Sequence, residues 1–102
     1  MKIIKCLSEN IECTLDAAEE NIKNAMKYKL EYPIAARAFY NQSIILMDSL
    51  KGQHDAVTTL IDNYRKEKGD PPAPMMAVYE YLHERHITKA AAIKTLQDMF
   101  NK

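Results

Sequence analysis

The sequence lacks, or nearly lacks, several features that mark common classes of protein. Tryptophan is absent, and the 102 residues include only two glycines, two cysteines and four prolines. No apolar run approaches the roughly 18–20 residues that span a bilayer, and the first residues hold too short an apolar stretch for a secretory signal. Basic and acidic residues balance at 14 each, so the formal net charge is zero. We therefore expect neither a membrane nor a nucleic acid as a partner.

The two cysteines, Cys6 and Cys13, are seven residues apart. On one helix their Cα atoms would be separated by about 10.5 Å, whereas a disulfide needs less than about 7 Å. The sequence also has no CxxC unit of the kind that binds zinc. We interpret both as small apolar residues of a reduced, cytoplasmic protein.

Glycine and proline divide the chain into three pieces with helical periodicity, at about 9–30, 33–68 and 74–100. The first helix should begin after Ser8 as its N-cap. The second begins at Pro33, whose missing N–H costs nothing in a first turn; the sequence leaves open whether it continues through Gly52 or bends or breaks there. The third is expected to be one helix, and 86–88 is the place where an irregularity would fall. The apolar positions of the first piece are Ile11, Leu15, Ala18, Ile22, Ala25 and Met26.

These elements predict an all-α protein with a single domain, residues 1–102, folded as an antiparallel bundle of three long helices. The middle helix would be the longest and would carry apolar side chains over a wide arc, including Leu46, Met47 and Leu50. Three helices cannot cover so wide an arc, so we expect a homodimer.

Polar residues interrupt the apolar face expected for the middle helix. Gln42, Ser49 and Gln53 follow each other at steps of seven and four, so they share one side of a helix. Buried polar groups need partners, at a cost of roughly 1–3 kcal/mol if they are left unsatisfied. Neither serine nor glutamine is a good ligand for iron or zinc, so we interpret them as a hydrogen-bonded layer.

Histidine and glutamate supply the candidate metal ligands. Glu80 and His83 form a Glu-x-x-His pair on one side of a helix, a pattern found in the metal sites of bundles, and His54 lies on the middle helix. His86 falls on the apolar stripe and is interpreted as a core residue. The acidic flank of the first helix is either a solvated face or a source of carboxylate ligands, and it comprises Glu12, Asp16, Glu19 and Glu20.

Several segments resemble the small ferritin-like, rubrerythrin-type helical proteins of bacteria and phages. The resemblance spans nearly the whole chain and rests on LDAAE at 15–19, KYKLEYP at 27–33, AA at 35–36, FY at 39–40, QH at 53–54, IDNYRK at 61–66, PP at 71–72, Met76, YEYLH at 79–83 and IK at 93–94. The resemblance implies a ferritin-like bundle. It also implies a di-metal site, with a Glu-x-x-His on the middle helix and a carboxylate beside the histidine that matches His83.

At the positions where that family carries its ligands, this sequence departs from the pattern. Leu46 and Ser49 stand in place of the Glu-x-x-His, and Leu82 stands beside His83. Only Glu19 (or Glu12), His54 and His83 would survive from the family's ligand set. Because a di-iron centre needs about six protein ligands, this remainder cannot hold two irons.

The sequence therefore predicts a ferritin-like protein with a degenerate di-metal site, without catalytic activity or cofactor, that acts as a dimeric or partner-binding module. The alternative is a protein that holds a single divalent ion (iron, manganese or zinc) through Glu19, His54, Glu80 and His83, with weak oxidase or storage activity. No hydrolase or phosphate-loop motif is present to support a different enzyme class.

Overall fold

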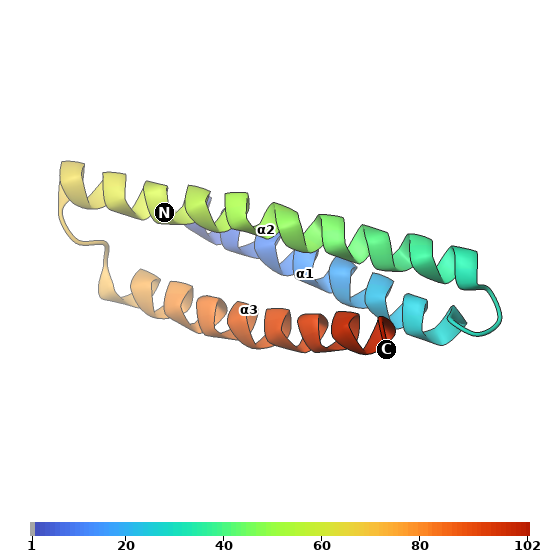
Figure 1. Ribbon diagram of the computed structural model, residues 1–102. Helices are drawn as coiled ribbons and strands as arrows, with labels where there is room; N and C mark the ends of the chain where they lie inside the picture. Colours follow the sequence, from blue (N-terminus) through green and yellow to red (C-terminus); the bar gives the residue numbers. More distant parts are fainter. Residues whose placement is uncertain (1) are drawn as a thin grey trace.

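The computed structural model describes the backbone of residues 2–102 and the side chains of residues 5–102, and over this range the chain forms a bundle of three helices without strands (Figure 1). Helix α1 spans Lys2–Tyr28, α2 spans Pro33–Lys68 and α3 spans Ala73–Phe100. The all-α class is confirmed, and the bounds of α2 and α3 agree with the predicted 33–68 and 74–100 to within one residue. No helix in the described range is both long and apolar enough to cross a membrane.

The start of α1 differs from the prediction. The helix begins at Lys2, seven residues earlier than expected, so Ser8 is a helical residue rather than an N-cap. Its side chain is buried within the bundle. An acidic residue after a serine is typical of a helix start, yet Glu9 lies on the exposed side of a helix that has already begun.

Glycine and proline mark the two connections between helices. The first joins Tyr28 to Pro33, where the N–H of Tyr32 bonds to the carbonyl of Tyr28. The second begins at Gly69, whose φ of 83° lies in the left-handed region that favours glycine. The N–H of Gly69 bonds to the carbonyl of Arg65 and closes the last turn of α2.

Neither helix is interrupted at the positions where the sequence left this open. Helix α2 runs through Gly52 as one continuous element, because a single glycine is tolerated within a helix at a modest cost. Helix α3 likewise passes through 86–88 without interruption, and there the hydroxyl of Thr88 donates to the carbonyl of Glu84 within the helix.

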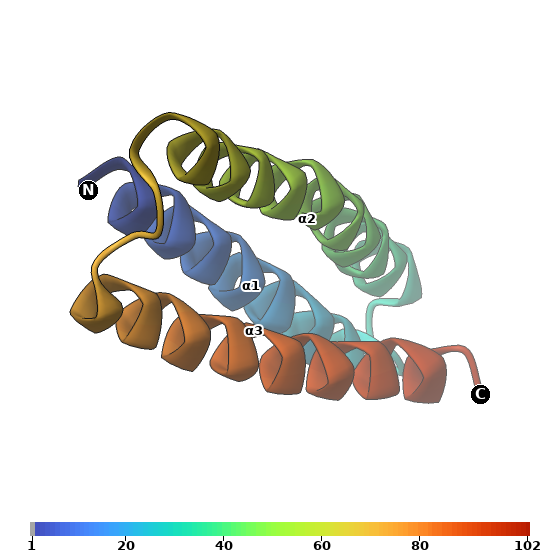
Figure 2. The ribbon, with the colours of Figure 1, turned by 90° about the vertical axis from the view of Figure 1, so that its left-hand side faces the viewer.

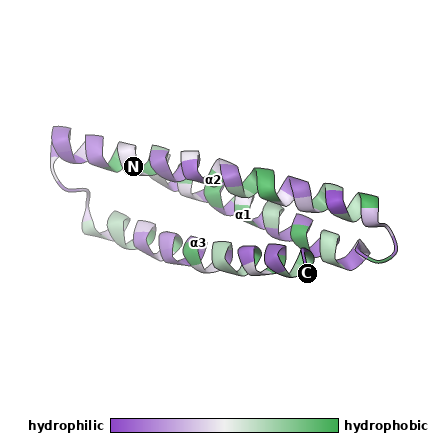
Figure 3. Cartoon of the chain, in the orientation of Figure 1, coloured by the Kyte–Doolittle hydropathy of each residue, from purple (hydrophilic) through white to green (hydrophobic). Residues whose placement is uncertain are grey.

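Helix α1 lies between α2 and α3 and packs along both of them, whereas α2 and α3 make far less contact with each other (Figure 2). The apolar stripe predicted for α1 is confirmed, and most of it is completely buried. The last turns of α2 are mostly hydrophilic (Figure 3). The main core residues are Ile11, Leu15, Ala18, Ile22, Ala25, Ala36, Leu50, Val57, Ile61, Ile93 and Phe100.

The polar layer predicted on α2 is partly wrong. Gln42 and Ser49 are exposed, and only Gln53 is half-buried, where its side-chain amide bonds to the hydroxyl of Thr14 at 3.1 Å. The buried polar side chain of α2 is instead Ser43, whose Oγ accepts a bond from Nε2 of Gln97 at 3.3 Å. The buried face of α2 follows steps of seven from Ala36 and is rotated away from the face expected.

Candidate functional site

Three imidazoles lie together where α2 meets α3. His83 and His86 are three residues apart, so they project from the same side of α3, and both approach His54 of α2. The ring centroids of His54 and His83 are 5.7 Å apart, and those of His54 and His86 are 6.2 Å apart. We call His54, His83 and His86 the histidine cluster.

The histidine cluster is poorly supplied with hydrogen-bond partners. His86 is only 3% exposed, and its Nε2 has no partner among the described residues. Nδ1 of His83 is likewise buried without a partner within the described part of the chain. Tyr79 stacks on the ring of His83, with centroids 5.7 Å apart. Burial of an imidazole away from water disfavours its charged form, so the surroundings of His86 favour the neutral ring.

The electrostatics of the cluster act in the same direction. Burial lowers the pKa of His54, and the facing His83 adds to this effect against the opposing carboxylate of Asp55. Burial also lowers the pKa of His86, although the Glu12 carboxylate opposes it. The neighbouring His54, His83 and Arg85 lower the pKa of His86 further.

Of the four predicted metal ligands, the structure brings His54 and His83 together. The carboxylate of Glu19 instead pairs with Lys23 on its own helix at 3.3 Å. Glu80 is exposed on α3. Over the residues that the structure describes, no group of three or more histidine, cysteine, aspartate or glutamate side chains is arranged to hold a metal ion.

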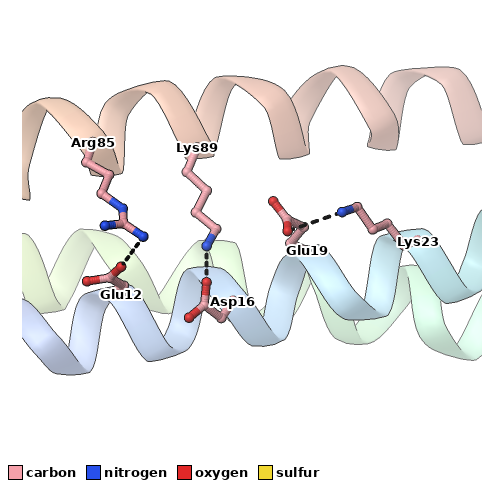
Figure 4. Close-up of polar contacts among 6 residues, drawn as sticks. All are labelled: Glu12, Asp16, Glu19, Lys23, Arg85 and Lys89. Atoms are coloured by element: carbon pink, nitrogen blue, oxygen red, sulfur yellow. Dashed lines mark hydrogen bonds and ion pairs between the residues drawn. The ribbon is translucent and has the colours of Figure 1, made fainter.

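The acidic flank of α1 contacts basic residues of α3 (Figure 4). Glu12 pairs with Arg85 at 2.9 Å, and Asp16 pairs with Lys89. Arg85 and Lys89 are four residues apart on α3, as Glu12 and Asp16 are on α1, so the two pairs form a ladder between the helices. The matching i,i+4 spacing of acids and bases is visible in the sequence, but the interpretation of these acids as metal ligands or a solvated face missed the contact.

The positions that resemble the family's ligand sites carry side chains with other contacts. Leu46 is half-buried and packs against the core. The hydroxyl of Ser49 donates to the carbonyl of Leu46 at 2.7 Å, so it is satisfied by its own helix and exposed to solvent. Leu82, beside His83, is half-buried. None of these three side chains can supply a carboxylate or an imidazole to the interior.

Large apolar side chains remain on the surface of the bundle. Ile34 is 88% exposed and Ile45 is 60% exposed, both on α2. The connection that precedes α2 contributes further apolar area, and a shallow hollow is lined by Tyr32, Pro33, Ile34 and Ala38 among others. Exposed large apolar residues also occur on α3, so the described surface includes Leu30, Tyr32, Ile34, Ile45, Val78, Tyr81, Ile87 and Met99.

Comparison with protein-family models, with curated proteins and with solved structures found no match for the chain.

Proposed function

We propose that this chain is a non-catalytic, partner-binding helical module, a ferritin-like antiparallel bundle and single domain whose di-metal site has degenerated. The observation that carries the proposal is the pair of contacts at positions 46 and 49. Leu46 packs against the core, and Ser49 bonds to its own helix. A site built for two metal ions needs carboxylate and imidazole donors here, and the side chains present contribute packing instead.

The surface supports a role in binding. Ile34 and Ile45 leave apolar area in water on the longest helix, and such area on a small protein commonly marks an interface. A second copy of the chain is the simplest partner, because most soluble oligomers are symmetric assemblies of one chain. We propose the cytoplasm as the compartment, since Cys6 and Cys13 are both free and exposed, as a reducing environment permits.

Light scattering over a dilution series tests the assembly. The dimeric form predicts a mass near twice the 11.7 kDa of one chain at high concentration, falling on dilution. The mass of a single chain at every concentration would contradict it.

Aerobic oxidation of Fe²⁺ tests the absence of catalysis. The oxidation rate in the presence of the protein should equal the rate in buffer alone. An acceleration that His54→Ala abolishes would contradict the proposal.

The histidine cluster favours a second candidate, in which the chain holds one divalent ion. Two buried ring nitrogens, which have no partner among the side chains that the structure describes, lie beside a third imidazole. Neutral imidazole is a common ligand for zinc, iron and related ions. Glu19 would have to leave Lys23, and Glu80 would have to turn inward, to complete the predicted set. A titration with Co²⁺ would then give visible absorption bands that His54→Ala and His83→Ala remove.

A further inference from the structure

Nothing within its own chain explains why position 52 is a glycine. It lies in the interior of α2, where glycine destabilises a helix relative to alanine. Its backbone is helical, and a Cβ built at this position would meet nothing within 4 Å. Neither a special backbone conformation nor a close neighbour in the bundle therefore requires glycine here. What the residue does provide is a gap on the exposed surface of α2.

Gly52 shares the outer face of α2 with the two exposed isoleucines. Ile34 and Gly52 are eighteen residues apart, which is about five helical turns, so they lie on one line at a separation of about 27 Å. Ile45 falls within about 20° of the same line. This face points away from the core, since the buried residues of α2 (Ala36, Ser43, Leu50, Val57 and Ile61) lie on the opposite side. The outer face thus combines projecting apolar side chains with an open gap.

Two opposite charges lie along one edge of this face. Arg37 and Asp48 are eleven residues apart, about three turns, and both are exposed. The Arg37 guanidinium lies over the rings of Tyr40 and of Phe100 on α3, at 5.3 and 5.5 Å from their centroids. Among the ion pairs formed by the described residues, none includes Arg37 or Asp48.

Both pairs have nearly the same midpoint along the helix. The middle of Ile34 and Gly52 is position 43, and the middle of Arg37 and Asp48 falls between 42 and 43. In a twofold contact between two helices running in opposite directions, residues at equal distances from the axis face each other. A twofold axis that crosses the outer face at the level of residue 43 along α2 would place Ile34 opposite Gly52 of the other copy. The same axis would place Arg37 opposite Asp48.

We infer that a second copy of this chain docks on the outer face of α2, with Ile34 over the gap at Gly52 and Arg37 paired to Asp48 across a twofold axis near residue 43. The inference rests on the proposed dimeric function and names its surface. A second copy is favoured over another partner because one face supplies both the projection and the gap, and both the cation and the anion. The two complementary pairs have nearly the same centre, as a self-complementary interface requires.

A charge swap tests this pairing by sedimentation equilibrium. Arg37→Glu and Asp48→Arg each create two like-charge contacts across the axis, so each should raise the dimer dissociation constant about tenfold or more. The double variant R37E/D48R restores opposite charges and should return the constant toward that of the native chain. Asp62→Arg is the matched control, because Asp62 is also exposed on α2 but its symmetric position lies before the helix begins. It should leave the constant unchanged.

Gly52→Leu provides a second test that does not depend on Arg37, whose aromatic contacts also serve the fold. A Cβ added at this position meets no described atom within 4 Å beyond the adjacent backbone of α2, so the helical circular dichroism should be kept while the dimer is lost. A native dimer that Gly52→Leu and the charge variants leave intact would overturn this surface while leaving the dimeric function in place. A native chain that stays monomeric at every concentration would overturn both.

Discussion

At the scale of single residues, the least ordinary feature is a cluster of three imidazoles at the junction of α2 and α3. His86 is almost completely buried, and its Nε2 lacks a hydrogen-bond partner in the described structure. The energetic consequence is a preference for the neutral form, because a charged ring would lose its hydration and face two other imidazoles. Stability should therefore depend on proton concentration near neutral pH.

Acidification should destabilise the bundle through His54 and His86. Their pKa values in the folded state lie below the ordinary 6.5 that applies to the unfolded chain. At a pH below 6.5 the unfolded state consequently binds more protons than the folded state. The free energy of unfolding therefore has its full value above that pH and decreases as the pH falls below it. Urea unfolding between about pH 8 and pH 5.5 measures this, a range in which most carboxylates stay ionised. His86→Leu should flatten the dependence, and greater stability in acid would contradict this expectation.

Gly52 allows a second prediction at the same scale. Replacing it with alanine removes the conformational cost of a glycine within a helix, and the added Cβ meets no other atom within 4 Å. We expect Gly52→Ala to raise the free energy of unfolding by about 0.5–1 kcal/mol. The measurement is urea unfolding at a dilution where the chain is monomeric. A decrease in stability would show that α2 needs the glycine for its own shape.

At the scale of elements, α1 is the helix that holds the bundle together. It contacts both other helices, and apart from Ser8 its buried residues are apolar. Its polar contacts with α3 are ion pairs at the surface, where the Asp16 and Arg85 side chains are about half exposed. Exposed ion pairs contribute little to stability because water screens them and side-chain entropy opposes them.

The relative weight of these two kinds of contact can be measured on neighbouring residues of α1. Leu15→Ala should lower the free energy of unfolding by about 2–5 kcal/mol, since it leaves a cavity at a fully buried position. Asp16→Asn should cost less than about 1 kcal/mol, although it removes the pair with Lys89. Urea denaturation of both variants gives the comparison. Equal losses would mean that the ion pairs bind α3 as strongly as the core does.

The bond between Ser43 and Gln97 joins α2 to α3 in the interior. Ser43→Ala would leave Nε2 of Gln97 buried without its acceptor, at a cost of about 1–3 kcal/mol. Gln97→Leu in the same chain should recover part of this loss, because both polar groups are then removed together. A double-mutant cycle in urea measures the coupling. Strict additivity of the two substitutions would show that the bond contributes nothing.

The elements were more predictable than the faces they present. Proline and glycine define the ends of α2 and the start of α3 by local backbone geometry, so a single sequence contains that information. The buried side of α2 depends on contacts with the other helices instead. Four successive apolar residues, Ile44, Ile45, Leu46 and Met47, place apolar side chains around much of the helix. More than one buried face therefore fitted the sequence, and the predicted face that contains Gln42 and Ser49 was wrong.

The candidate site was predictable in part for the same reason. The burial of His86 was predicted from its position on the apolar stripe, and it is confirmed. Its proximity to His54 depends on how α2 and α3 align along the bundle, which no local pattern records. For Glu19, in contrast, the deciding contact lies within its own helix. The family resemblance and its place on the acidic flank made it a candidate ligand, yet Lys23 lies one turn away on the same helix and pairs with it.

At the scale of the whole molecule, the bundle is a rod of 56 × 19 × 18 Å, and its length is close to that of α2 alone. A small elongated bundle has a large surface for its volume, and here part of that surface is apolar. These features lead to one central claim, that the interior is filled by side chains rather than by metal ions and that the outer surface serves association.

Native mass spectrometry of the chain, purified without chelators from cells supplied with iron, manganese and zinc, tests that claim most directly because it reads assembly and bound metal together. We expect a metal-free species at twice the 11.7 kDa of the chain. A species carrying one or more metal ions per chain, lost when His54 and His83 are replaced by alanine, would contradict the claim.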